Sequence, residues 1–234
     1  MGRQMFTGLI EATGIITAII PIKGDVRLVV QSETLDFTDV ALGDSIASNG
    51  ICLTVVELAD RRYAVDVSRE TLQKSAIAHY KVGDMLNLEK AMKPTTRFGG
   101  HMVAGHIDGV GVIDVLKKDA RSIYVELTLP SELMRYTADK GSITIDGISL
   151  TTNQIKVDKN RVCLNIIPHT AKKTNIDRHW HRGALVNVEV DLIARYLERL
   201  LQGNAPASTT APNNGGISNG GISEILLRQT GFID

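Results

Sequence analysis

The stretch that decides the fold is SNGICLTV, residues 48–55, because it returns in altered form as IDGISLTT at residues 145–152. Gly50 and Gly147 are 97 residues apart, and so are Leu53 and Leu150. A glycine at the same place in both phrases is typical of a turn between strands that needs a positive φ. The repeated phrase therefore predicts two copies of one β-rich unit.

The repeat extends far beyond these eight residues. MFTGLIEATGIITAI from Met5 matches MVAGHIDGVGVIDVL from Met102, and VGDMLNLEKA matches RGALVNVEVD. Alternating or β-branched segments such as RLVVQS, RYAVDVS and SITIDG predict short strands, and PSELMRY and TLDFTD favour short helical turns. We therefore expect an all-β protein with two tandem domains, residues 5–97 and 98–190, each of about six strands closed into a barrel. A β-sandwich is the alternative.

The ends of the chain differ from the repeats. After Asp191, LIARYLERLLQG has the apolar spacing of one amphipathic helix, predicted at residues 191–203. Its apolar stripe must be covered by the barrels or by another subunit. Residues 204–234 are predicted to be a disordered tail, because GNAPASTTAPNNGGISNGG is of low complexity; for the last stretch, ISEILLRQTGFID, a helix is the alternative. Residues 1–4 are an extension or a tag remnant.

Composition excludes several classes of function. The 26 basic and 26 acidic residues cancel, without the single-sign block of a nucleic-acid arm or a polybasic membrane patch. No apolar run is long enough to span a membrane. Cys52 and Cys163 predict free thiols in a reducing compartment, hence a cytoplasmic protein. The five-residue spacing of His101 and His106 does not favour a metal site.

The two copies differ where chemistry is possible. Asn49, Cys52 and Leu9 of the first copy become Asp146, Ser149 and His106 in the second, and Asp44 becomes Lys140 or Gly141. Taken singly, these are ordinary strand and turn substitutions. Together they predict two related but unequal pockets, which suits a protein that handles two copies of one ligand in two roles.

MFTGLIE, SNGICLTV, GGHMVAGHIDG, IDGISLT and NIIPHT together resemble the α-type riboflavin synthase family, from about Met5 to Leu201. The resemblance implies six-stranded Greek-key barrels and a homotrimer assembled through the C-terminal helices. It implies dismutation of two 6,7-dimethyl-8-ribityllumazine molecules, giving riboflavin and 5-amino-6-(D-ribitylamino)uracil, without metal or redox cofactor. The pair would react between the N-terminal barrel of one subunit and the C-terminal barrel of another. Lumazine synthase is a further candidate partner.

The resemblance also implies two sets of substrate contacts. The set of the N-terminal pocket is Phe6, Gly8, Leu9, Ile10, Cys52, Leu53, Thr54, Asp66, Val67, Ser68, Arg69, Glu70 and Thr71. The set of the second pocket is Gly105, His106, Ile107, Lys140, Ser149, Leu150, Thr151, Ile167, Pro168, His169, Thr170, Ala171 and Lys172.

The resemblance further implies a catalytic set. His106 would transfer a proton, Asp146 and Ser149 would assist addition at C7, and Lys140 would supply positive charge. The remaining members would line or polarise the pockets: Ser45, Cys52 and Thr151.

Three rival functions fit parts of the sequence. A non-catalytic lumazine-binding protein on the same fold would lack the polar residues of the second pocket, whereas His101, His106, Asp146 and Ser149 are present here. A flavin-reductase-type barrel would need a following nicotinamide domain. A purely structural two-barrel protein would leave the paired polar substitutions unexplained.

Overall fold

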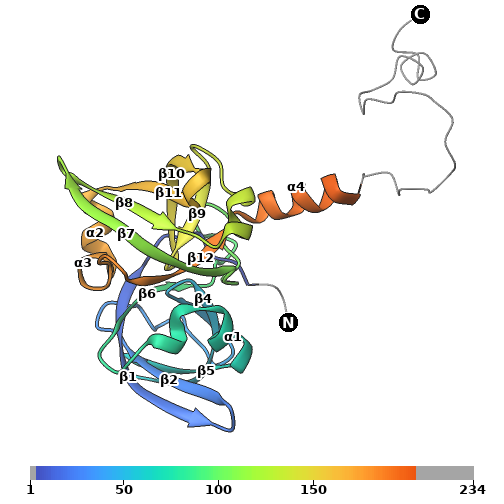
Figure 1. Ribbon diagram of the computed structural model, residues 1–234. Helices are drawn as coiled ribbons and strands as arrows, with labels where there is room; N and C mark the ends of the chain where they lie inside the picture. Colours follow the sequence, from blue (N-terminus) through green and yellow to red (C-terminus); the bar gives the residue numbers. More distant parts are fainter. Residues whose placement is uncertain (1–3, 204–234) are drawn as a thin grey trace, which may run out of the picture. The chain divides into compact units, whose positions relative to one another are not determined.

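The computed structural model describes residues 4–203, and its strands form two closed antiparallel barrels (Figure 1). The first barrel contains β1 (Ala12–Ile22), β2 (Asp25–Gln31), β3 (Ser45–Ser48), β4 (Ile51–Ala59), β5 (Arg62–Val67) and β6 (Met85–Lys90). The second contains β7 (Gly109–Asp119), β8 (Ser122–Thr128), β9 (Ser142–Ile145), β10 (Ile148–Lys156), β11 (Arg161–Ile166) and β12 (Leu185–Val190). The strand order β1-β2-β5-β4-β3-β6 recurs as β7-β8-β11-β10-β9-β12. The predicted pair of six-stranded barrels is confirmed, and the sandwich is wrong.

Short helices connect or follow the strands. In the first copy these are α1 (Arg69–Lys74) and η1 (Ala76–His79). In the second they are η2 (Ser131–Tyr136), η3 (Val157–Lys159), α2 (Pro168–Lys173) and α3 (Ile176–His179), followed by α4 (Leu192–Gly203). The helical turn predicted at PSELMRY is confirmed as η2, whereas TLDFTD forms bends and a turn. The six-residue helices α1 and α2 are too short to leave a periodic apolar pattern.

The duplication is preserved even in its irregularities. The register of β1 against β2 shifts between Ile16 and Ala18, and that of β7 against β8 shifts between Ile113 and Val115. β4 and β10 carry a second pair of shifts at matched positions. β-Bulges bend strands and increase their twist, so each copy curves into its barrel at the same points.

The opening phrase is a two-residue hairpin turn in both copies. Asn49 and Gly50 join β3 to β4 with φ values of 47° and 78°, and Asp146 and Gly147 join β9 to β10 with 46° and 80°. Asn-Gly and Asp-Gly favour turns that need two positive φ angles. The two turns also face each other, because a Cβ on Gly50 would lie 2.7 Å from the Gly147 nitrogen. Glycine is therefore required twice, by the turn and by the contact.

Matched asparagines hold the barrels together around these turns. Asn87 Nδ2 donates a hydrogen bond of 2.9 Å to the Asp146 carbonyl in the second barrel. Asn187 Nδ2 donates one of 2.9 Å to the Asn49 carbonyl in the first. The side chains of Asn49, Asn87, Asp146 and Asn187 are all buried. The contact between the two barrels is therefore a polar network with approximate two-fold symmetry.

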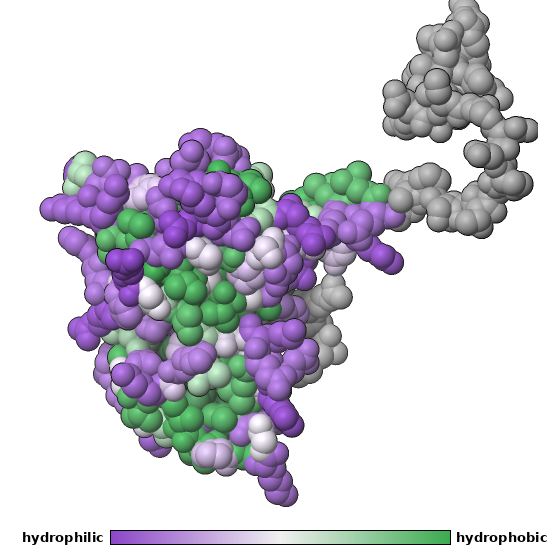
Figure 2. Space-filling model, in the orientation of Figure 1, coloured by the Kyte–Doolittle hydropathy of each residue, from purple (hydrophilic) through white to green (hydrophobic). Residues whose placement is uncertain are grey.

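Helix α4 begins as predicted, and the other described residues leave its apolar face uncovered. Asp191 Oδ1 accepts a hydrogen bond of 2.9 Å from the Ile193 nitrogen, which caps the helix. The apolar side chains Ile193, Leu197 and Leu200 are 57%, 55% and 65% exposed, and they form an apolar strip along α4 (Figure 2). The barrels do not cover this strip. Among residues 4–203, no helix is long and apolar enough to cross a membrane. The tail predicted at residues 204–234 lies outside the described residues.

Candidate functional site

The segments that lead into β1 and β7 cross each other before they enter their barrels. Phe6 and Val103 form an antiparallel bridge, in which the Phe6 nitrogen donates to the Val103 carbonyl (2.8 Å) and the Val103 nitrogen donates back (3.1 Å). Both side chains are fully buried, together with Ala47. Phe6 therefore anchors the crossing. The resemblance implied that Phe6 contacts the substrate, but its buried side chain does not face an open pocket.

Each crossing segment docks on the barrel of the other copy. The Ser149 nitrogen of β10 donates to the Gly8 carbonyl (2.8 Å), and the Cys52 nitrogen of β4 donates to the Gly105 carbonyl (2.9 Å). A Cβ on Gly8 would lie 2.6 Å from Ser149 Cβ, and one on Gly105 would lie 2.5 Å from Cys52 Cβ. Only glycine permits so close an approach at both places.

This crossing corrects the grouping of the expected substrate contacts. Ile10 packs against the core of the second barrel, and Ile107 packs against the core of the first. The contacts around Gly8 therefore belong with Ser149, and those around Gly105 and His106 belong with Cys52. Adjacency in sequence suggested the opposite grouping, because a local pattern does not tell on which barrel a segment docks.

Two buried glutamates fix the crossing segments. Glu89 accepts hydrogen bonds from the Thr7 nitrogen (2.7 Å) and the Gly8 nitrogen (2.9 Å), and Glu189 accepts from the nitrogens of Ala104 (2.6 Å) and Gly105 (2.9 Å). Burial raises the pKa of both carboxyls to about 7, although these hydrogen bonds act in the opposite direction. The sequence shows Glu89 and Glu189 at matched positions, but nothing in their pattern reveals what they bind.

We call the first composite site the N-barrel groove, formed where Gly105, His106 and Ile107 meet β4 and α1. It comprises two open cavities of about 370 and 340 Å³ that share Cys52 and His106. Ser45 and Thr54 line one cavity, and Thr71 lines the other. Burial raises the pKa of the Cys52 thiol, although a hydrogen bond with Ser45 acts in the opposite direction. The thiol is therefore protonated and neutral, and it lines the groove.

The place in the second copy that corresponds to the N-barrel groove is where Gly8 and Leu9 meet β10, and we call it the C-barrel groove because of that correspondence. Here His101 Nδ1 lies 2.7 Å from Ser149 Oγ, and Nε2 lies 3.0 Å from Thr144 Oγ1. Burial lowers the pKa of His101, which favours the neutral ring. His101 was singled out in GGHMVAGH but not as a catalytic candidate. A histidine held between two hydroxyls is suited to orient Ser149 and to take up its proton.

The structure also settles the ambiguous match of Lys140. Lys140 has a φ of 64°, and its nitrogen donates to the Thr152 carbonyl, while Gly43 has a φ of 92° and donates to Val55 in the same way. Lys140 therefore corresponds to Gly43, and Asp44 corresponds to Gly141. Thr151 pairs with Ser142 on the neighbouring strand and is exposed.

The expected contact segments follow β5 and β11 as α1 and α2. Ser68 caps α1, its Oγ accepting from the Thr71 nitrogen. Asp66 is paired with Arg27 on the outside of the barrel. Some expected contacts have side chains in the barrel cores, where only their main chain can reach a ligand: Leu53, Val67 and Ala171. The others are at least partly open to solvent: Arg69, Glu70, Leu150, Ile167, Pro168, His169, Thr170 and Lys172.

Asp146 lies in a different place from the one its expected role requires. Its side chain is fully buried between the barrels, where Oδ1 accepts from the Asn187 nitrogen (2.8 Å) and Oδ2 accepts from Trp180 Nε1 (2.9 Å). Burial raises its pKa to about 6. A carboxylate with both oxygens bound and no open surface cannot contact a substrate, so the structure gives Asp146 a structural role.

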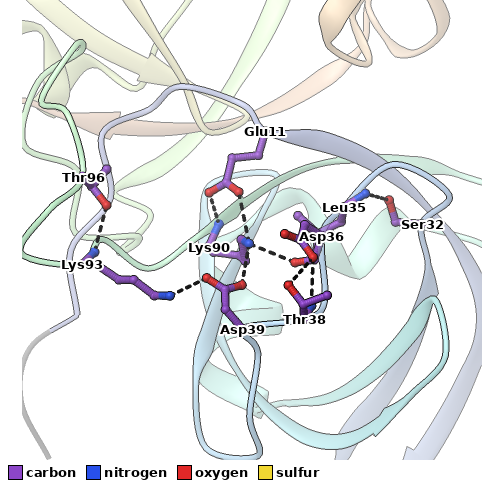
Figure 3. Close-up of polar contacts among 9 residues, drawn as sticks. All are labelled: Glu11, Ser32, Leu35, Asp36, Thr38, Asp39, Lys90, Lys93 and Thr96. Atoms are coloured by element: carbon purple, nitrogen blue, oxygen red, sulfur yellow. Dashed lines mark hydrogen bonds and ion pairs between the residues drawn. The ribbon is translucent and has the colours of Figure 1, made fainter.

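A further cavity, of about 500 Å³, lies beside Leu9 on the first barrel and is lined in part by charged residues. Figure 3 shows the polar contacts of Glu11, Asp39, Lys90 and Lys93 there. Asp39 bridges two lysines, with Oδ1 2.7 Å from Lys90 Nζ and Oδ2 2.5 Å from Lys93 Nζ. Hydrogen bonds from Lys90 and Lys93 lower the pKa of Asp39 to about 2. The positive charges of Lys90 and Lys93 are thus compensated by Asp39.

Comparisons with known proteins agree with the geometry. The model of the lumazine binding domain family matches residues 7–91 and 104–191, one match for each copy. The riboflavin synthase of Photobacterium phosphoreum is 46% identical over 229 residues, which cover 98% of this chain and 100% of that protein. The riboflavin synthase of Bacillus subtilis (strain 168) is 39% identical over 197 residues, which cover 84% of this chain and 90% of that protein.

Solved structures share the fold. LumP complexed with riboflavin superposes with a TM-score of 0.71 at 24% identity, covering 79% of this chain and 98% of that chain. LumP complexed with 6,7-dimethyl-8-(1'-D-ribityl) lumazine gives 0.69 at 23%, with the same coverage. At these identities, the likeness concerns the fold alone.

Proposed function

We propose a function from one premise, that the chain belongs to the lumazine-binding domain family and carries the domain twice. It is an enzyme of riboflavin biosynthesis, a transferase of the riboflavin synthase type. It acts on two molecules of 6,7-dimethyl-8-ribityllumazine. One donates a four-carbon unit to the other, and the products are riboflavin and 5-amino-6-(D-ribitylamino)uracil.

The observation that carries this proposal is the match to proteins named riboflavin synthase along nearly the whole chain, 46% identical over 98% of it. The two grooves support it further, since they are equivalent in backbone and different in chemistry. One offers Cys52 and His106, and the other offers Ser149 held by His101. Two molecules of one substrate in two roles need such a pair.

The chemistry requires little more than positioning and proton transfer. The C7 methyl group of the lumazine is acidic, because its anion delocalises into the electron-poor ring. Holding two rings face to face makes a bimolecular step local, which is worth about 7–11 kcal/mol of the barrier. A general acid–base group adds about 10²–10⁴-fold. We assign this proton transfer to His106 and addition at C7 to Ser149, whose hydroxyl is oriented by His101.

The remaining groups bind and polarise the substrates. Thr71 of α1 and Thr170 of α2 are at corresponding places in the two copies, where each can bind a ribityl hydroxyl. Lys140 and Thr151 belong to the open edge of the C-barrel groove, where Lys140 supplies positive charge. Ser45 and Cys52 are wall groups of the N-barrel groove. No cofactor is needed for this set of steps.

We further propose that the N-barrel groove of one subunit faces the C-barrel groove of another in a homotrimer. The exposed apolar strip of α4 supports this assembly, since nothing among residues 4–203 covers Ile193, Leu197 and Leu200. The polar side of α4 is tied to the second barrel, where Arg135 pairs with Glu198 at 2.8 Å. As a biosynthetic enzyme with free thiols, the protein belongs in the cytoplasm, and lumazine synthase is a candidate partner.

The test is to incubate the purified chain with 6,7-dimethyl-8-ribityllumazine alone and to follow riboflavin by fluorescence. The proposal predicts one riboflavin for every two lumazines consumed. Saturable lumazine binding without riboflavin would instead identify a non-catalytic lumazine-binding protein, the second candidate. Neither binding nor turnover would refute both.

A further inference from the structure

Gln4 occupies in the first copy the position that His101 occupies in the second. The two residues are 97 positions apart, the spacing that relates Cys52 to Ser149, and each directly precedes a methionine of the crossing segments. Because the copies share their backbone, the Gln4 side chain is the counterpart of the ring that orients Ser149.

The partners of these two side chains differ. The ring nitrogens of His101 are bonded by Ser149 Oγ and Thr144 Oγ1. The counterpart of Thr144 is Ala47, whose methyl group offers no hydrogen bond, and Ala47 faces Cys52 across β3 and β4 as Thr144 faces Ser149. The first copy therefore lacks a counterpart of the Thr144 hydroxyl, one of the two hydroxyls that hydrogen-bond to His101 in the second copy.

The amide oxygen of Gln4 is consequently an unsatisfied acceptor. Gln4 Oε1 is buried and has no hydrogen-bond partner among residues 4–203. A buried acceptor without a partner costs about 1–3 kcal/mol, and such groups are rare in native proteins unless a ligand or water completes them. Gln4 also lines the 370 Å³ cavity of the N-barrel groove, together with Cys52, Thr54 and His106.

We infer that Gln4 is a substrate-binding residue of the N-barrel groove: its side chain lines the cavity, and its buried amide oxygen turns toward the lumazine bound there and accepts a hydrogen bond from it. The lumazine carries suitable donors in its ring imide and its ribityl hydroxyls. This inference rests on the proposed function, since it assumes that a lumazine occupies the groove. The inference distinguishes the two grooves: in the first the Gln4 amide binds the ligand, and in the second the His101 imidazole binds Ser149.

The experiment compares Gln4→Leu with Gln31→Leu in the full-length protein. Leucine nearly keeps the volume of Gln4 and removes its amide, both the acceptor oxygen and the NH₂ donor group, while Gln31 is an exposed residue of β2 that lines none of the three cavities described above. Lumazine binding is titrated by fluorescence and fitted to two sites, and steady-state turnover is measured alongside. Thermal unfolding checks that each variant is folded.

Gln4→Leu is expected to weaken one of the two binding sites about fivefold and to raise KM by a similar factor, as the loss of one net hydrogen bond predicts. The other site and kcat should stay at wild-type values, and the unfolding midpoint of the ligand-free variant should not fall, because an unsatisfied buried acceptor has been removed. All properties of Gln31→Leu should stay at wild-type values. Wild-type affinity at both sites, or an equal loss at both, would overturn the inference while leaving the proposed function intact. A wild-type chain that neither binds nor converts lumazine would overturn the proposed function itself.

Discussion

Replacing Asp146 by asparagine separates a structural role from a catalytic one. The carboxylate is fully buried and receives two donors, the Asn187 nitrogen at 2.8 Å and Trp180 Nε1 at 2.9 Å. Asparagine has nearly the same shape, but it presents one oxygen and one NH₂ group. Its oxygen can accept a hydrogen bond from only one of the two donors, and the other donor then faces the NH₂ group, which cannot accept.

The size of the effect follows from that mismatch. One buried donor loses its acceptor, which costs about 1–3 kcal/mol. Removing the charge offsets a part of this, because burial disfavours the carboxylate and raises its pKa to about 6. We therefore expect the free energy of unfolding of Asp146→Asn to fall by about 1–2 kcal/mol at pH 7, after that offset. Turnover at a temperature where the variant is folded should stay within about threefold of wild type, because no open surface connects Asp146 to a substrate.

The assay pairs urea unfolding, followed by Trp180 fluorescence, with riboflavin formation from lumazine. Asp119→Asn, on the exposed end of β7, serves as the control and should change neither quantity. A hundredfold loss of turnover with unchanged stability would refute the reasoning, and would return Asp146 to the catalytic set.

Three further predictions concern the central turns, proton transfer and pH. Gly50→Ala should lower the free energy of unfolding by more than about 3 kcal/mol, because its Cβ would lie 2.7 Å from the backbone of the facing turn. Gly43→Ala, whose Cβ would have nothing within 4 Å, should lower it by only about 1 kcal/mol in the same urea titration. Equal losses for the two variants would contradict the contact between the turns. His106→Ala should lower kcat at least about tenfold and leave lumazine affinity within a few-fold, and unchanged turnover would remove His106 from its role. Burial raises the pKa of Glu89 from 4.5 to about 7, so the folded state holds its proton more tightly, and the free energy of unfolding should decline as the pH rises between these two values. Glu89→Gln should make the free energy of unfolding depend less on pH. An unchanged pH dependence would contradict the raised pKa of Glu89.

Local patterns in the sequence were sufficient for many strands and turns, because strand alternation and turn chemistry act over a few residues, but they did not separate a barrel from a sandwich. RYAVDVS and SITIDG predicted β5 and β9, and the glycines at 50 and 147 predicted the turns. The internal repeat supplied the long-range information, since two copies of one pattern must fold alike. The short helices α1 and α2 escaped prediction because six residues carry less than two turns of periodicity.

The crossing of the two copies was not predictable in the same way. Gly8 and Gly105 were recognisable as matched glycines, but which barrel each would approach depends on the Phe6–Val103 bridge and the glutamate clamps, which join residues more than eighty positions apart. Asp146 shows the converse error. A polar residue that differs between two copies can serve packing as well as chemistry, and only its buried partners decide between them.

The central claim is that the reaction needs the N-barrel groove of one subunit and the C-barrel groove of another. Its most direct test is to co-express His106→Ala with Ser149→Ala, which damage different grooves, and to measure riboflavin formation by the mixed assemblies. If grooves from different subunits meet, some sites combine the intact N-barrel groove of one variant with the intact C-barrel groove of the other, and turnover will exceed that of both parents. Turnover that only averages the two parents would contradict the account.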